Sequence, residues 1–297
     1  MPRSVPDNFL PDEGVSMVNC LRLRCFSRGV LPRGRGWLER RLKLTYDFRG
    51  GEVLCVEDAM APIRVYSAPT PAEREELRSQ LMLDDHELDA TLDPEEIPRL
   101  EFGGEVGSAN LIWKQPKNVS VGHQLRFDVS SVGMFIRPGL VVLVTADDQL
   151  DFGEREFRGV HNLNDFLLKQ LLHTVHHYLG HLKVIKQINA ELGSKISVSM
   201  ENRYYLQMLA LSESLIYYID GIEANAAVLG KLRSVSHRLD LNADQVDSLH
   251  DIALDMQQCA RQAGIYSSVL SGLMDARGAI INNNVNTLLK NLTLISV

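Results

Sequence analysis

Four histidines lie close together in the stretch HTVHHYLGH, which the sequence predicts to be helical: His173, His176, His177 and His181. Histidines four residues apart on a helix can share a metal ion, so His173 and His177 are a candidate zinc pair. At 100° per residue, all four lie opposite the apolar stripe of the same helix. The catalytic pattern HExxH is absent. We expect a solvated polar face; the alternatives are adventitious or regulatory metal binding, and a catalytic metal.

A row of aspartates begins about seventy residues later: Asp244, Asp247, Asp251 and Asp255. Spacings of three and four residues place these carboxylates on one helical face. Hard cations such as Mg²⁺ prefer oxygen ligands and keep several waters, so the row could bind a cation if a partner surface approached it. The alternative is a solvated face opposite the apolar side of the helix. Because no lysine or arginine interleaves with the four acids, a purely structural face is less well supported.

The C-terminal stretch NNNVNTLLKNLTLISV, residues 282–297, passes from polar to apolar without a helix stop signal. Lys290 is the single charge among the last eleven residues. A lysine at a membrane surface can extend its amine to the lipid headgroups while its stem stays in apolar surroundings. The stretch therefore predicts either a buried C-terminal helix or a helix that continues into a bilayer.

Composition and motifs exclude several classes of function. The 297 residues carry a formal net charge of −7, which argues against a nucleic-acid partner. The four cysteines, Cys20, Cys25, Cys55 and Cys259, show no CxxC spacing and are typical of reduced thiols in a cytoplasmic protein. No secretory signal and no apolar run of about 20 residues is present. Nucleophile elbows, phosphate-binding loops and dinucleotide fingerprints are also absent, so we expect no enzymatic activity.

The chain divides into two halves at about residue 160. Residues 1–160 hold short β-rich runs with period-two alternation, which predict an α/β or α+β domain. The expected strands are 18–26, 41–48, 52–58, 97–106, 107–114, 124–138 and 140–146, with one helix over 69–92. Residues 161–241 predict two long helices, over 162–192 and 200–239, and residues 242–297 a third. Helices this long indicate a coiled coil, a stalk or a helix that enters a bilayer.

Two segments resemble the CorA family of divalent-cation transporters. SGLMDARGAIINNNVNTLLKNLTLISV is similar to the family's SGLLDxYLSxxSNxxNEVMKVLTxIA, where a stalk helix enters the first membrane helix. The matching positions are Ser271, Gly272, Leu273, Asp275, Asn283, Asn286, Lys290, Leu292 and Thr293. LMLDDHELDATLDPEEIPRLEF is similar to the family's HPLxLEDxLNxxQRPKVEx. Its matching positions are Leu88, Asp89, Leu92, Pro98, Arg99 and Glu101.

The resemblance implies an α+β fold: an N-terminal α/β/α sandwich with a mixed sheet, then long antiparallel helices and a C-terminal stalk helix that leads to a truncated first membrane helix. It implies a soluble cytoplasmic part of a homopentamer at the cell inner membrane, joined to the bilayer through a missing C-terminal segment. Mg²⁺, with Co²⁺ or Ni²⁺ as alternatives, would be transported, and intracellular Mg²⁺ would hold the closed state.

Residue by residue, the resemblance implies two sites. Regulatory metal would bind between subunits at Asp89, Asp247, Asp251 and Asp255, although Asp89-Ala90 stands where the family commonly has Glu-Asp. The pore entrance would include Asn286, Leu289, Leu292 and Thr293. The family's Gly-Met-Asn signature lies beyond Val297, so a ZntB-type zinc transporter stays an alternative. A soluble helical scaffold protein is the other.

Overall fold

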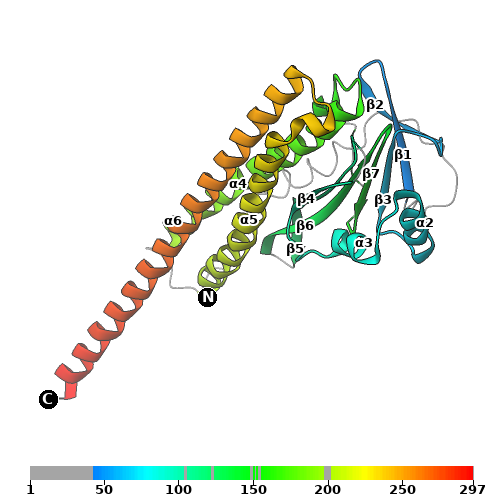
Figure 1. Cartoon of the computed structure of the whole chain (residues 1–297). Helices are drawn as coiled ribbons and strands as arrows, with labels where there is room; N and C mark the ends of the chain where they lie inside the picture. Colours follow the sequence, from blue (N-terminus) through cyan, green and yellow to red (C-terminus); the bar gives the residue numbers. More distant parts are fainter. Residues whose placement is uncertain are drawn as a thin grey trace, which may run out of the picture.

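The computed structural model describes residues 43–103, 106–121, 124–147, 150, 152, 155–196 and 202–296. A mixed sheet of seven strands, in the order β2-β1-β3-β7-β6-β5-β4, forms its centre (Figure 1). The strands are β1 (Lys43–Arg49), β2 (Glu52–Val56), β3 (Ile63–Ser67), β4 (Arg99–Phe102), β5 (Ala109–Val121), β6 (Gln124–Arg137) and β7 (Leu140–Thr145). The β3–β7 pair is parallel and the other neighbouring pairs are antiparallel.

Two short helices cover one face of the sheet: α2 (Pro71–Leu81) and α3 (Asp85–Leu92). The prediction of one helix over 69–92 is wrong, because Met82 adopts a left-handed backbone with φ of 53° and ends α2. Asp84 then caps the new helix, accepting from the backbone N–H of Glu87 at 2.7 Å. The break turns the chain so that α3 also lies on the sheet.

Three long elements follow: α4 (Leu163–Ile196), α5 (Asn202–Ser234) and α6 (Ala243–Ser296). The short 3₁₀ turns η2 (Arg155–Phe157) and η3 (Ser236–Leu239) precede α4 and join α5 to α6. With 54 residues, α6 is about 80 Å long at 1.5 Å per residue. Its C-terminal part projects past the ends of α4 and α5 (Figure 1).

Alternate residues of the central strands serve two separate cores. Met134, Ile136 and Leu143 face the long helices, where their cluster also includes Trp113, Tyr178 and Tyr218. Phe135, Val142 and Val144 face the other way and pack with Leu77, Leu81 and Leu88 of α2 and α3. This two-sided burial follows from the period of two along a strand. The molecule is thus an α/β/α arrangement in an α+β fold, as expected.

A buried asparagine of α5, Asn225, hydrogen-bonds to β5 at the point where β5 is no longer paired with β4. Pairing of β4 with β5 stops at Ile112. Two residues later, the backbone N–H of Lys114 donates to Asn225 Oδ1 at 3.0 Å, and Asn225 Nδ2 donates to the Lys114 carbonyl at 2.7 Å. Asn225 is fully buried, so its amide replaces the missing strand and satisfies both backbone groups.

The long helices lie within a few residues of the predicted 162–192, 200–239 and 242–297. Strand β3 was not predicted, although it is the strand that makes the parallel pair. The predicted strand 97–106 is too long, because β4 covers only four residues. The predicted strand 107–114 is too short, because β5 covers thirteen. The expected strand over 18–26, with Cys20 and Cys25, lies outside the described residues.

Candidate functional site

The four predicted aspartates occupy the first turns of α6. An Asn242–Gln245 capping box starts the helix, with the Gln245 N–H donating to Asn242 Oδ1 at 2.9 Å. Three of the aspartates are exposed and the fourth is half-buried: Asp244, Asp247, Asp251 and Asp255. The opposite side of these turns is buried through Leu249, Ile252 and Met256. The carboxylates are thus available to an ion or a partner, and the helix itself is held by its apolar face.

A groove of about 530 Å³ lies between the starts of α4 and α6. Asp165, Asp244 and Asp251 line it, whereas Asp247 and Asp255 do not. The two helix starts are linked within this groove, because the buried Gln245 side chain of α6 donates to Asp165 Oδ1 of α4 at 2.7 Å. The aspartate row is therefore divided between this oxygen-rich groove and the neighbouring surface of α6.

Asp89 lies on the other side of the sheet from these aspartates. It belongs to α3, where its side chain is 62% exposed and pairs with Arg74 Nη1 at 3.5 Å. The sheet separates α3 from the long helices (Figure 1). One chain therefore does not bring Asp89 together with Asp251 or Asp255. Within the described residues, no group of three or more His, Cys, Asp or Glu side chains is arranged to hold a metal.

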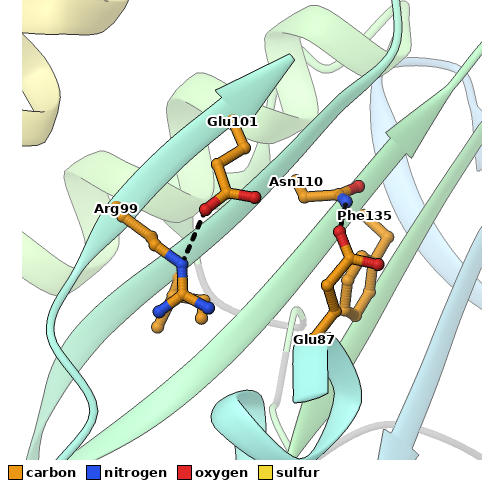
Figure 2. A pocket seen from close by; sticks show the side chains of 6 residues that line it. Glu87, Arg99, Glu101, Asn110 and Phe135 are labelled. Atoms are coloured by element: carbon orange, nitrogen blue, oxygen red, sulfur yellow. Dashed lines mark hydrogen bonds and ion pairs between the residues drawn. The ribbon is translucent and has the colours of Figure 1, made fainter. Parts of the chain in front are cut away.

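Two further acids, Glu87 on α3 and Glu101 on β4, already have polar partners, as Figure 2 shows. Asn110 Nδ2 donates to Glu87 Oε1 at 2.8 Å, and Arg99 Nε donates to Glu101 Oε1 at 2.9 Å. The space between them measures about 10 Å³. Such a volume accommodates about one water molecule at most. This corner of the sheet is consequently a closed polar contact.

The four histidines of α4 do not all lie on the solvated face that we expected: His176 is exposed, but His177 is half-buried and His181 is buried. His181 is 7% exposed, its Nδ1 is hydrogen-bonded to the Tyr218 hydroxyl, and its ring lies 5.4 Å from that of Phe127. His177 packs edge-on against His181, with ring centroids 4.4 Å apart. The prediction was wrong because β6 and α5 cover the side of α4 opposite its main apolar stripe.

Burial sets the protonation of the inner histidines. Desolvation lowers the pKa of His177 to about 4, and the nearby His173 lowers it further against a smaller opposing effect of Glu156. Desolvation likewise lowers the pKa of His181 to about 3. Glu156 instead engages the outer pair, with Oε2 at 2.7 Å from His173 Nδ1 and Oε1 at 2.6 Å from His176 Nδ1. Both inner rings are neutral at pH 7.

The residues expected at a pore entrance lie on the projecting end of α6. Asn286, Leu289, Leu292 and Thr293 are all exposed, and they fall within an arc of about 120° on the helix. Leu292 is 67% exposed and Leu289 59%. No helix in the described part of the chain carries an apolar stretch long enough to cross a membrane. Within the described residues, the end of α6 is an exposed surface with many apolar side chains that no other element covers.

Sequence reasoning missed two polar residues of this region, Glu156 and Asp165, whereas Gln245 was expected to form a capping box with Asn242, as it does. Asp165 stands three residues after Asn162, as Gln245 stands three residues after Asn242, so it could also have been read as the second half of a capping box. Their link across the two helix starts joins residues 80 positions apart. Nothing in the local sequence indicates such a contact.

The sandwich domain that continues into a long helix has the fold of solved CorA and ZntB structures. The family model described as CorA-like Mg²⁺ transporter protein matches residues 65–297, and the chain belongs to this family. A curated relative is the cobalt/magnesium transport protein CorA of Methanocaldococcus jannaschii. It is 22% identical over 241 residues, which is 77% of this chain and 72% of the relative.

Solved structures of similar fold include the complete CorA magnesium transporter of M. jannaschii, with a TM-score of 0.69, 18% identity, and coverage of 87% of this chain and 83% of that one. The ZntB cytoplasmic domain of Vibrio parahaemolyticus gives a TM-score of 0.62 at 13% identity, covering 81% of this chain and 98% of that domain. Full-length CmaX gives 0.70 at 14% identity, with coverage of 87% and 84%. These likenesses establish the fold.

Proposed function

We propose that the chain is the cytoplasmic regulatory and funnel domain of a CorA-like divalent-cation channel that conducts Mg²⁺ and senses it. The observation that supports this most is the composition of α6, which joins a row of exposed aspartates at one end to an uncovered apolar end at the other. A single rigid helix can transmit a change at the aspartates to the segment that enters the membrane. In this proposal the domain acts by binding rather than by catalysis.

Metal sensing in this proposal requires two copies of the chain. Asp89 lies beyond the sheet from Asp247, Asp251 and Asp255, so a shared cation must sit between α3 of one copy and α6 of the next. A hydrated Mg²⁺ suits this geometry, because it tolerates few direct carboxylate ligands and retains waters. An ion bound only in the closed arrangement shifts the population toward that arrangement.

The uncovered end of α6 is proposed as the entrance to the pore at the inner face of the cell membrane. Asn286 and Thr293 would present polar groups and Leu289 and Leu292 an apolar surface at the start of the membrane-spanning part. Five copies around one axis would place these residues in rings. The continuing reading frame is expected to encode two apolar spans with Gly-Met-Asn between them, and sequencing it tests that expectation directly.

Zinc is the alternative cargo, favoured by the likeness to the ZntB cytoplasmic domain. The four histidines give zinc little support, since His177 and His181 are held inside the fold. Uptake of Mg²⁺, Co²⁺ and Zn²⁺ by cells that express the whole gene distinguishes the two cargoes. Mg²⁺ uptake above that of vector-only cells supports the proposal, and uptake of Zn²⁺ alone favours the zinc alternative. If neither ion is taken up, a helical scaffold protein is the remaining interpretation.

A further inference from the structure

The groove between the starts of α4 and α6 is large enough to hold a small organic molecule. Its volume of about 530 Å³ falls in the range of roughly 300–1,000 Å³ that is typical of small-molecule sites. Part of its lining is apolar, namely the buried Leu168 and Ile252 and the half-buried Leu172. A hydrated metal ion gains nothing from such a surface, whereas the hydrocarbon part of an organic ligand packs against it.

Three charged side chains in this lining are available to a ligand: Asp244, Asp251 and Lys169. Among the described residues, none of these three side chains has a hydrogen-bond or ion-pair partner. Asp165, which also lines the groove, is already occupied. Its Oδ1 accepts from Gln245 Nε2 at 2.7 Å and its Oδ2 from a backbone N–H at 3.0 Å. The groove thus offers two open carboxylates and one open ammonium group.

These three charges follow one another along the groove. Asp244 and Asp251 are seven residues apart, so they lie on the same side of α6 and about 10 Å apart along its axis. The helices α4 and α6 run in the same direction from the link between Asp165 and Gln245 (Figure 1). Measured from this link at 1.5 Å per residue, Lys169 stands about 6 Å along α4, and Asp251 about 9 Å along α6. Lys169 is therefore close in height to Asp251 and farther from Asp244.

We propose that the groove binds a basic amino acid such as arginine or lysine. The ammonium and carboxylate groups on its α-carbon pair with Asp251 and Lys169, and the cation at the end of its side chain pairs with Asp244. Its aliphatic stem crosses the apolar lining between these two ends. Ion pairs of this kind include charge-assisted hydrogen bonds, which are roughly twice as strong as neutral ones.

Other small ligands fit the three charges less well. A linear polyamine has no group for Lys169, and its positive charges are repelled by that ammonium. A single metal ion does not bridge aspartates about 10 Å apart, and no metal-holding group of side chains is present within the described residues. Acidic and short amino acids have no cation that reaches Asp244. The pattern of charges thus selects an amino acid with a long, positively charged side chain.

The groove site lies within one chain, so it requires neither a second copy nor transport. It meets the proposed function at one point, because Asp251 is also a proposed ligand of the regulatory cation. A bound amino acid and Mg²⁺ then compete for that carboxylate, and each lowers the affinity of the other. Only this competition rests on the proposed function.

Isothermal titration calorimetry on the complete protein, purified in detergent, tests the site with L-arginine and two analogues. We expect L-arginine to bind once per chain with a dissociation constant below about 1 mM. Agmatine lacks the carboxylate and L-citrulline lacks the side-chain charge, so each should bind at least about fivefold more weakly. These comparisons use the wild-type protein and do not depend on the folding of a variant. No saturable binding of L-arginine, or equal binding of all three compounds, would overturn the proposal.

Two substitutions assign the individual charges. Lys169→Met should weaken L-arginine about fivefold without weakening agmatine, because agmatine has no carboxylate for the lysine to bind. Asp244→Asn should weaken L-arginine by a similar factor and remove its advantage over L-citrulline. The matched controls are Lys183→Met on α4 and Asp275→Asn on α6, which are exposed, lie outside the groove and should bind L-arginine as wild type does. Equal weakening in the controls, or none in the test variants, would contradict the proposal.

The outcomes separate this ligand from the transporter function. Absence of L-arginine binding in a protein that takes up Mg²⁺ refutes the groove ligand and leaves the proposed function intact. Binding of L-arginine without metal uptake supports the groove ligand and contradicts the proposed function. Tighter binding of spermidine than of L-arginine would assign the groove to polyamines and refute the amino-acid site.

Discussion

Acidification should destabilise the fold through two desolvated histidines, the half-buried His177 and the buried His181. Their pKa values in the folded chain are about 4 and about 3, because burial disfavours the charged ring, whereas an unfolded histidine has a pKa of about 6.5. The neutral form is therefore preferred in the fold. Its stabilising contribution is complete above pH 6.5 and is lost as the pH falls toward the folded values.

The size of the effect follows from these pKa values. Between pH 7 and pH 5, an unfolded histidine becomes almost fully protonated while the folded ring stays neutral. Each histidine then costs about 2 kcal/mol in the free energy of unfolding, and the pair roughly 4 kcal/mol. Ordinary carboxylates remain largely ionised above pH 5, so this window isolates the histidines.

Urea unfolding followed by circular dichroism at pH 7, 6 and 5 measures the loss. A variant with His177→Gln and His181→Asn should lose roughly 4 kcal/mol less than wild type over that range, because neither replacement titrates. The control is His86→Gln on the exposed surface of α3, which should behave as wild type. A wild-type stability that is flat between pH 7 and pH 5, or an equal loss in the double variant, would refute the reasoning.

Two packing predictions concern the sheet. Asn225→Leu leaves the buried backbone N–H of Lys114 without its Asn225 acceptor and its C=O with only the Tyr178 hydroxyl at 3.5 Å, and should cost roughly 1–3 kcal/mol in urea unfolding. A loss below about 0.5 kcal/mol would contradict the role given to the Asn225 side chain. Gly133→Ala places a Cβ that overlaps the side chain of Thr91 and should cost about 1–3 kcal/mol by the same assay, and adding Thr91→Ser should recover part of it. Absence of any recovery would show that another contact is responsible.

The long helices could be predicted from the sequence because their apolar period extends over many turns. The 54 residues of α6 and the buried Leu249, Ile252 and Met256 follow directly from that period. Strand β3 was missed although β2 and β4 are no longer than it; its five residues lie between Pro62 and Pro69, just before a helix that Thr70 caps. The turn at Met82 was missed for a different reason, since a left-handed conformation at a non-glycine residue has no signature in the sequence.

The misreading of the histidines shows what periodicity omits. A helical wheel identifies one apolar face of α4 but cannot tell whether a second layer covers the polar side. In the fold, Phe127 of β6 and Tyr218 of α5 do so, and their aromatic surfaces accept neutral imidazoles. The aspartates of α6 were easier to place, because no other element among residues 43–296 that the structure describes lies over them. Their assignment as a regulatory site depends on a second copy, which a single chain cannot supply.

Metal influx under control of internal Mg²⁺ tests the central claim most directly. The whole gene is expressed, the protein is placed in liposomes, and Mg²⁺ entry is followed with a fluorescent indicator inside them. We expect wild-type influx to slow as internal Mg²⁺ approaches millimolar levels, and influx through the variant with Asp251→Ala and Asp255→Ala to continue. Asp275→Ala, on the same helix but outside the aspartate row, is the control and should slow as wild type does. No influx above protein-free liposomes would contradict the account, and equal slowing in the double variant would remove the aspartates from it.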